Sequence, residues 1–205
     1  MKTRAMLLTE NGPPENLTLT EVDIGDTGEH DVVVDMKAAG TSFPDVLMVA
    51  GEYQFKPDLP FVPGQEGAGI VREVGSAVTR VKPGDRVMTS HRTGAFAERA
   101  ILPESRVTLI PGNIDFVTAA SFRSNYATAL LAMQRARLQP GEVLLVHGAA
   151  GGVGMAAVHI GKYLGRTRHR YGRRRREARD RQGQGADEII NYTHGFREQV
   201  KALTG

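Results

Sequence analysis

The first half of the chain places apolar and polar residues in short runs that turn residues interrupt. Residues 17–22 alternate strictly, as a half-buried strand does, and residues 31–39 contain the β-branched run Val32-Val33-Val34. Turn signals such as Lys82-Pro83-Gly84-Asp85 separate these runs. Many short strands with frequent turns predict a partly closed β-barrel or a sandwich. Strands are predicted at residues 17–22, 31–39, 67–74 and 86–88, and a short helix at residues 44–49.

The period of the apolar positions changes after residue 115. Between residues 115 and 137 the apolar residues recur at helical spacing. The continuous aliphatic run of residues 142–147 predicts a buried strand, and an apolar helix is predicted at residues 152–164. We therefore predict two domains, a β-rich domain at residues 1–115 and an α/β domain at residues 116–205.

The composition excludes several classes of protein. With 205 residues, 40% hydrophobic and 24% charged, the chain is too apolar for wholesale disorder and long enough for one large or two modest domains. It contains no cysteine, so disulfides, a thiolate nucleophile and a cysteine-bound zinc are excluded. No apolar stretch approaches the ~20 residues of a membrane span, and the N-terminal one is too short for a signal peptide. We expect a cytoplasmic protein with no membrane partner.

The positive charge is concentrated in one segment. The formal net charge is +3, but residues 166–181 hold nine arginines against two acidic residues, a local charge of +7, so the rest of the chain carries −4. Any argument for a nucleic-acid partner therefore rests on this segment alone. No aromatic platform or reading helix accompanies the arginines, which disfavours nucleic acid. A non-catalytic protein that binds nucleic acid or an anionic surface through this segment is kept as an alternative.

A glycine-rich turn with the spacing Gly148-x-x-Gly151-x-x-Gly154 joins the predicted strand at 142–147 to the helix after it. A helix N-terminus offers unpaired N–H groups and a partial positive charge, and glycines let the backbone approach a pyrophosphate. We interpret the turn as a dinucleotide-binding site; the alternative is a tight strand–helix turn without a ligand. The candidate cofactor-binding residues are Gly148, Ala149, Gly151, Gly152, Val153 and Gly154.

Further motifs accompany this turn in order along the chain. They are Phe43-Pro44-Asp45-Val46-Leu47-Met48, Gly51-Glu52-Tyr53, residues 61–69, residues 81–87, Gly94-Ala95-Phe96-Ala97-Glu98 and Tyr126-Ala127-Thr128-Ala129. Together with residues 141–154, they resemble the medium-chain dehydrogenase/reductase superfamily, specifically its zinc-free quinone oxidoreductases. The resemblance implies the fold class α+β plus α/β: a GroES-like, partly open β-barrel domain followed by an incomplete Rossmann domain. It also implies that NADPH binds in the cleft between the domains and that a small-molecule quinone or enone is the substrate.

Zinc-dependent members of this superfamily carry a Cys early in the β domain, a Gly-His-Glu motif and a second Cys. Here Ser42 and Gln65 stand near the first two positions, and the six histidines show no ligand spacing, so we expect no metal. Polarising an alcohol is hard without a Lewis acid, whereas a quinone is already electrophilic. Positioning the nicotinamide then supplies most of the catalysis. This favours hydride transfer from NADPH to a quinone or enone; the alternative is a zinc-free alcohol or enoyl reductase of the same superfamily.

The resemblance places three further residues at the site. Ser42 and Tyr53 are the candidate catalytic residues, near the nicotinamide or the substrate, and Thr128 is a candidate contact to the nicotinamide amide. Tyr53 either donates a hydrogen bond to a carbonyl oxygen or is a packing aromatic, and Thr128 is otherwise an ordinary helix residue. We expect Asp45 to be a helix-end carboxylate rather than a general base. We expect His159 on the surface of its helix.

Residues 166–184 do not fit the implied Rossmann domain. That domain needs a second aliphatic strand near residue 166, but no Val, Ile, Leu, Met or Phe occurs between Leu164 and Ile189. We therefore predict that residues 166–184 are disordered or poorly packed, because such a stretch cannot offset the entropy of folding into a buried strand. Our hypothesis for its origin is a local frameshift in the coding DNA, later restored.

The chain is also short for the implied fold. Only 53 residues follow Gly152, fewer than two βαβ units of ~30 residues, so a six-stranded sheet cannot be completed. On the resemblance, the later strands, half of the cofactor site and the usual homodimer interface are then absent. The segment that distinguishes NAD from NADP is the aberrant one.

Overall fold

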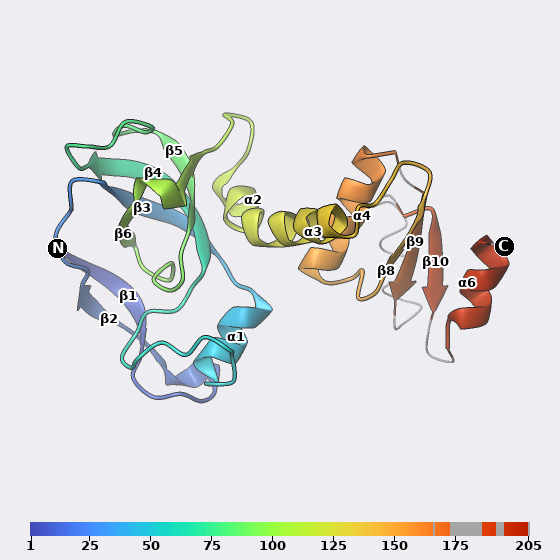
Figure 1. The fold of residues 1–205 in the computed structure, drawn as a ribbon. Helices are drawn as coiled ribbons and strands as arrows, with labels where there is room; N and C mark the ends of the chain where they lie inside the picture. The colour runs from blue at the N-terminus through green and yellow to red at the C-terminus, as the bar shows by residue number, and fades with distance from the viewer. Residues whose placement is uncertain (166, 173–185, 192–194, 205) are drawn as a thin grey trace. The chain divides into compact units, whose positions relative to one another are not determined.

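The computed structural model describes residues 1–165, 167–172, 186–191 and 195–204 (Figure 1). The chain divides into two compact units, Met1–Arg123 and Ser124–Gly205. This division falls eight residues after the boundary predicted at residue 115. The intervening helix α2 (Phe116–Ala120) packs its two buried alanines on the sheet of the first unit, so it belongs with that unit.

The first unit is built on a five-stranded antiparallel sheet with the strand order β6-β3-β4-β5-β7. Val32, Val34, Val71 and Val87 are at most 1% exposed and pack in one cluster, because alternate side chains of each strand turn inward. The register of β3 against β4 shifts at two points, which bends the strands. The strands are β3 (Asp31–Gly40), β4 (Glu66–Val74), β5 (Arg86–Ser90), β6 (Arg99–Pro103) and β7 (Val107–Leu109).

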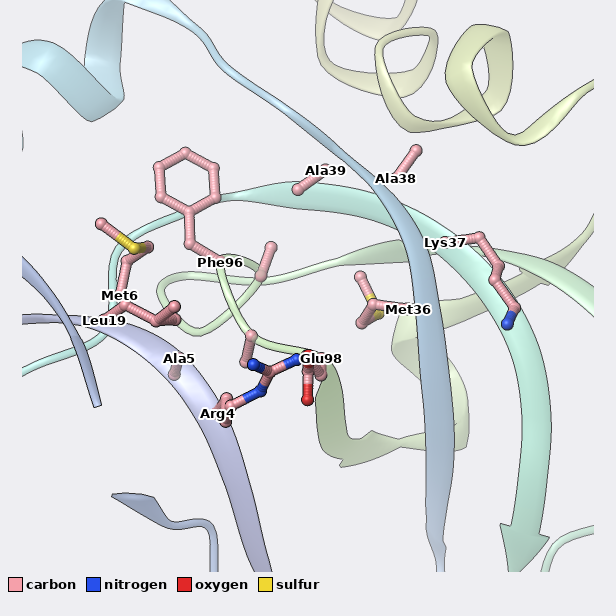
Figure 2. A pocket seen from close by; sticks show the side chains of 12 residues that line it. Arg4, Ala5, Met6, Leu19, Met36, Lys37, Ala38, Ala39, Phe96 and Glu98 are labelled. Atoms are coloured by element: carbon pink, nitrogen blue, oxygen red, sulfur yellow. Dashed lines mark hydrogen bonds and ion pairs between the residues drawn. The ribbon is translucent and has the colours of Figure 1, made fainter. Parts of the chain in front are cut away.

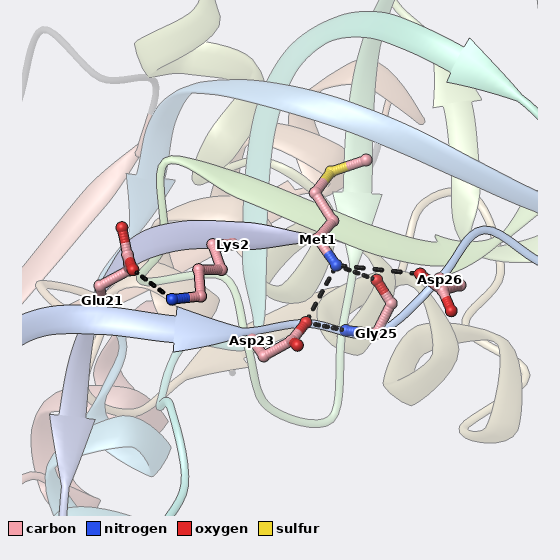
Figure 3. Close-up of polar contacts among 6 residues, drawn as sticks. All are labelled: Met1, Lys2, Glu21, Asp23, Gly25 and Asp26. Carbon is pink, nitrogen blue, oxygen red and sulfur yellow. Dashed lines mark hydrogen bonds and ion pairs between the residues drawn. The ribbon is translucent and has the colours of Figure 1, made fainter.

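Strands β1 (Lys2–Leu8) and β2 (Leu17–Asp23) form a separate antiparallel hairpin. The ammonium group of Met1 donates to Oδ1 of Asp23 at 2.9 Å and to the carbonyl of Gly25 at 2.6 Å (Figure 3). The hydrogen bond from this ammonium, with one from the N–H of Gly25, holds the pKa of Asp23 below its ordinary value. An ion pair thus joins the start of β1 to the end of β2, in addition to the main-chain hydrogen bonds between the two strands.

Short helices connect these strands: η1 (Pro14–Asn16), α1 (Phe43–Val49) and η2 (Glu104–Arg106). α1 buries Met48 and Val49 against Leu8 and Phe61 in a second apolar cluster. The helix predicted at residues 44–49 is therefore confirmed.

The second unit contains a three-stranded parallel sheet with the order β10-β9-β8. Its core consists of Val146, Ala149, Val158 and Ala186, which come from β8, from α4 and from the turns beside them. Its elements are α3 (Arg123–Arg135), β8 (Val143–Val146), α4 (Gly152–Tyr163), β9 (Thr167–Gly172), β10 (Glu188–Asn191) and α6 (Arg197–Thr204). The helix predicted after the glycine-rich turn is confirmed, and so is the strand before it, but the predicted burial of that strand is wrong because Val143 and Leu145 are exposed.

The structure describes six of residues 166–184, and the prediction that this segment is disordered or poorly packed stays a prediction. Thr167–Gly172 form β9, the central strand of the sheet, which pairs in parallel with β8 and β10. A ladder is made by main-chain groups, which do not require aliphatic side chains. In addition, Val143 and Leu145 of β8 are 43% and 36% exposed, so this sheet is not buried on both faces. Residues 166 and 173–184, with most of the arginines, lie outside the described residues.

Within the described ranges, every sheet is open and none closes into a barrel. This agrees with the partly open barrel expected for the first unit. None of the helices described has both the length and the apolar content that a membrane span requires.

Candidate functional site

The glycine-rich turn leads from β8 into α4. Gly148 has a φ of +61°, a left-handed conformation that glycine adopts without strain. The N–H of Gly151 donates to the carbonyl of Gly148 at 2.9 Å and closes the turn. Gly151 is also the N-cap of α4, and in the described part of the chain no side chain caps this twelve-residue helix. An uncapped helix N-terminus is the arrangement that binds an anion.

The glycines of the turn are required for different reasons. A Cβ on Gly154 would lie 2.4 Å from the carbonyl oxygen of Gly148, so α4 packs on the turn at a distance that excludes a side chain. A Cβ on Gly152 would lie 2.4 Å from Oδ1 of Asn125, a residue of α3. Among the described residues, a Cβ on Gly151 would meet one atom, at 3.5 Å, and one on Gly148 would meet none within 4 Å. The turn is thus filled on the side of Gly152 and Gly154 and open at Gly148 and Gly151.

Ser42 precedes α1 and caps this helix together with Asp45. The N–H and the Oγ–H of Ser42 donate to Oδ2 of Asp45, at 2.8 and 2.6 Å. Asp45 is 2% exposed, and within the described part of the chain its Oδ1 accepts no hydrogen bond. The expected helix-end role of Asp45 is confirmed. Because the only hydroxyl proton of Ser42 is directed at Asp45, Ser42 is left as a hydrogen-bond acceptor toward any other group.

Tyr53 lies in the turn after α1, where its N–H donates to the carbonyl of Leu47 at 3.1 Å. Its half-buried ring packs against the cluster that contains Met48 and Phe61. Among the residues that the structure describes, none hydrogen-bonds the Tyr53 hydroxyl. The ring is therefore held by packing, while the hydroxyl keeps its donor for another group.

His91 lies beside Gln65, the residue that stands near the histidine position of the zinc motif. The N–H of His91 donates to the carbonyl of Gln65 at 2.7 Å, and its Nε2 is 2.7 Å from Oγ1 of the buried Thr89. Burial, and then the positive charge of Arg106, lower the pKa of His91 from 6.5 to about 4, so the ring is neutral at neutral pH. Across the described residues, no three His, Asp or Glu side chains gather as a metal site would require.

Thr128 is exposed on α3, two residues after Tyr126. The Tyr126 hydroxyl is 2.7 Å from Nδ1 of His159, a residue of α4. His159 is half-buried by this contact, so the expectation of a helix-surface residue is wrong. The two helices are instead joined by a polar contact between their side chains.

A cavity of about 340 Å³ lies in the first unit (Figure 2). The segment before β6, which lines it, bonds to two strands: Met36 N–H of β3 donates to the Glu98 carbonyl at 2.8 Å, and Met6 N–H of β1 donates to the Phe96 carbonyl at 2.9 Å. None of the predicted site residues lines it. The lining residues are Arg4, Ala5, Met6, Leu19, Met36, Lys37, Ala38, Ala39, Ala95, Phe96, Ala97 and Glu98.

Comparison with known proteins identifies the family. The family model of the alcohol dehydrogenase GroES-like domain matches residues 28–112. Quinone oxidoreductase-like protein 2 of Mus musculus is 40% identical over 98% of this chain. A crystal structure of a probable oxidoreductase from Mycobacterium abscessus covers the whole chain with a TM-score of 0.93 and 38% identity. The chain belongs to the medium-chain dehydrogenase/reductase superfamily. Another structure of this kind, the Escherichia coli quinone oxidoreductase complexed with NADPH, has a TM-score of 0.90 and 31% identity over the whole chain.

The chain spans 58% of the length of the mouse relative and 66% and 63% of the two solved chains. The resemblance to the medium-chain dehydrogenase/reductase superfamily is confirmed, and so is the GroES-like domain, whose match lies within the predicted β-rich domain. Both units have counterparts in the superfamily, since the solved structures align with the whole chain.

The six candidate residues from Gly148 to Gly154 form one turn, whereas the other three candidates are distributed between the two units. Ser42 and Tyr53 belong to the first unit, and Thr128 belongs to the second. Sequence reasoning missed the contacts of Asn125 and Tyr126 with α4. The available signals were Tyr126 within a family-like motif and a histidine at position 159 inside an otherwise apolar helix.

Proposed function

We propose that this chain forms a dinucleotide site and serves the zinc-independent transfer of a hydride from NADPH to a small quinone or enone, in the cytoplasm. The observation that carries the proposal is the uncapped N-terminus of α4 at an open glycine turn. The names of the relatives support it. In addition, the quinone oxidoreductases of Escherichia coli and Thermus thermophilus are known in complex with NADPH.

The turn suits a pyrophosphate in charge and in shape. The first amides of α4 and the positive end of the helix dipole attract an anion, and the first turn of α4 contains no acidic residue to repel it. Gly148 and Gly151 leave the approach free of side-chain atoms, since a Cβ there would point into unoccupied space or ordinary contact. We assign the pyrophosphate to Gly148, Ala149, Gly151, Gly152, Val153 and Gly154.

Ser42, Tyr53 and Thr128 are assigned to the reacting end of the site. When bound, NADPH supplies the hydride that reduces the acceptor. The Thr128 hydroxyl hydrogen-bonds the nicotinamide amide, and Ser42 accepts a hydrogen bond from an N–H or O–H group because its own proton is held by Asp45. Tyr53 donates its hydroxyl proton as a hydrogen bond to the carbonyl oxygen of the acceptor, where negative charge develops. No metal is assigned, since a quinone is electrophilic without a Lewis acid.

Gly151→Asp tests the proposal without disturbing the fold. A carboxylate at the N-cap stabilises a helix, so this variant remains folded, but its negative charge occupies the place assigned to the pyrophosphate. We expect titration of NADPH fluorescence to show binding by the natural chain and at least about tenfold weaker binding by Gly151→Asp.

Gly112→Asp is the matched control, because Gly112 is exposed in a turn of the first unit and a Cβ there meets nothing within 4 Å. This variant binds NADPH as the natural chain does. The proposal is refuted if the natural chain does not bind NADPH, or if Gly151→Asp binds it equally well. The oxidation of NADPH in the presence of a naphthoquinone, followed by absorbance, then tests the acceptor class.

A further inference from the structure

Side chains of Asn125 and Tyr126 on α3 contact α4, the helix that follows the glycine turn. The first contact joins Asn125 to the first residue of α4, Gly152, whose missing Cβ leaves the place that the Asn125 amide occupies. The second joins the Tyr126 hydroxyl to Nδ1 of His159 at 2.7 Å, seven residues further along α4. Two separated contacts fix both the distance and the rotation of one helix relative to the other.

The same contacts determine where Thr128 lies. Ala129 and Met133 are 2% and 6% exposed and extend the buried side of α3 from Asn125 and Tyr126, while Thr128 remains exposed. Thr128 follows Asn125 by three residues, so these two side chains are neighbours on the helix surface. Thr128 therefore lies on the edge of α3 beside the first turn of α4.

We propose that Asn125 and Tyr126 are positioning residues that hold Thr128 at a fixed place relative to the N-terminal amides of α4. This inference rests on the proposed function, in which those amides hold the pyrophosphate and Thr128 meets the nicotinamide amide. A dinucleotide has a fixed reach between these two groups, so a rotation of α3 misplaces Thr128 even when the turn itself is intact. Asn125 and Tyr126 thus couple the two halves of the cofactor site without touching the cofactor.

Binding of a cofactor fragment separates positioning from stability. NADPH and 2′-phospho-ADP-ribose share the adenosine, the 2′-phosphate and the pyrophosphate, but only NADPH has the nicotinamide. We expect Tyr126→Phe to bind NADPH about threefold to tenfold more weakly, the effect of one hydrogen bond, and to bind the fragment within about twofold of the natural chain. Tyr163→Phe is the matched control, because Tyr163 is 89% exposed at the end of α4, and it leaves both affinities unchanged.

Exchanges at His159 and Gly152 test each contact separately. His159→Gln keeps a hydrogen-bonding side chain opposite Tyr126 and retains the NADPH affinity, whereas His159→Leu reproduces the loss seen in Tyr126→Phe. Gly152→Ala places a methyl group where the Asn125 amide lies, and we expect it to weaken the binding of NADPH more than the binding of the fragment.

Three outcomes decide the matter. The positioning role is supported if Tyr126→Phe weakens the binding of NADPH but not of the fragment, and if His159→Gln binds NADPH as the natural chain does. Equal losses for NADPH and the fragment, or no loss for either, overturn it and leave the proposed function standing. If the natural chain binds neither molecule, the proposed function itself fails.

Discussion

Acid should weaken the first unit through His91. The folded state holds the pKa of this ring at about 4, while an exposed histidine titrates near 6.5, chiefly because the ring is buried and secondarily because Arg106 is positive. Between these two values the unfolded chain binds a proton that the folded chain does not, so lowering the pH favours unfolding. The stabilisation from a neutral His91 is complete above about pH 6.5 and is lost as the pH falls toward 4.

The size of the effect follows from the two pKa values. At ~1.4 kcal/mol for each pKa unit, the interval between 6.5 and about 4 corresponds to about 3 kcal/mol when the pH has fallen through both values. Such a loss is a large fraction of the stability of an ordinary domain, which is ~5–15 kcal/mol.

The assay compares the natural chain with His91→Gln, because the amide group of Gln reaches the position from which Nε2 contacts Thr89. Urea unfolding followed by circular dichroism, between about pH 7.5 and about pH 4.5, gives the free energy of unfolding of each protein. Since all other titrating groups are shared, the difference between the two curves reports His91 alone. We expect the natural chain to lose about 2–3 kcal/mol more than the variant across this range. Parallel curves would show that His91 is protonated freely in the folded chain and would refute the reasoning.

Three other substitutions test the packing and capping contacts. Gly154→Ala places a Cβ 2.4 Å from a main-chain oxygen and is expected to cost at least about 2 kcal/mol in urea unfolding, while Gly112→Ala costs little; equal stability of the two variants contradicts the packing described. Ser42→Ala removes the capping hydroxyl of α1 and should lower the free energy of unfolding by about 1 kcal/mol, and an unchanged thermal midpoint argues against that cap. Arg86→Lys loses the planar group that donates to the carbonyls of Gly112 and Ile114, in the segment before α2. We therefore expect α2 to open locally from the sheet more often than in the natural chain, which hydrogen exchange measures as faster exchange in residues 116–120.

The sequence predicts the elements with strong local signals. Alternation at residues 17–22 predicts β2, and the valine run at 32–34 predicts β3. The aliphatic run before a glycine cluster predicts β8 and the start of α4. These elements carry their signal in a local apolar pattern, either alternating or continuous. The glycine turn is also readable, because its spacing and its place between a strand and a helix are local properties.

The parts that could not be predicted depend on neighbours distant in the chain. β9 forms from Thr167–Gly172 because β8 and β10 supply ladders on both sides, information that its own composition does not contain. The sequence around His159 does not show its contact with Tyr126, because Tyr126 belongs to α3, 33 residues earlier in the chain. The site residues Ser42, Tyr53 and Thr128 came from resemblance, and their assignment to the reaction remains a prediction. The frameshift hypothesis also stays a prediction, which the coding DNA tests.

The unequal roles of the glycines in the turn set a pattern of mutational tolerance. A Cβ on Gly154 would overlap main-chain atoms, so a substitution there lowers the stability of the fold itself, whatever it does to ligand binding. A Cβ on Gly151 would make only an ordinary contact with the described residues, so a variant there remains folded and changes what the N-terminus of α4 attracts. Substitutions that change ligand specificity can therefore accumulate at Gly151, whereas folding requires glycine at position 154.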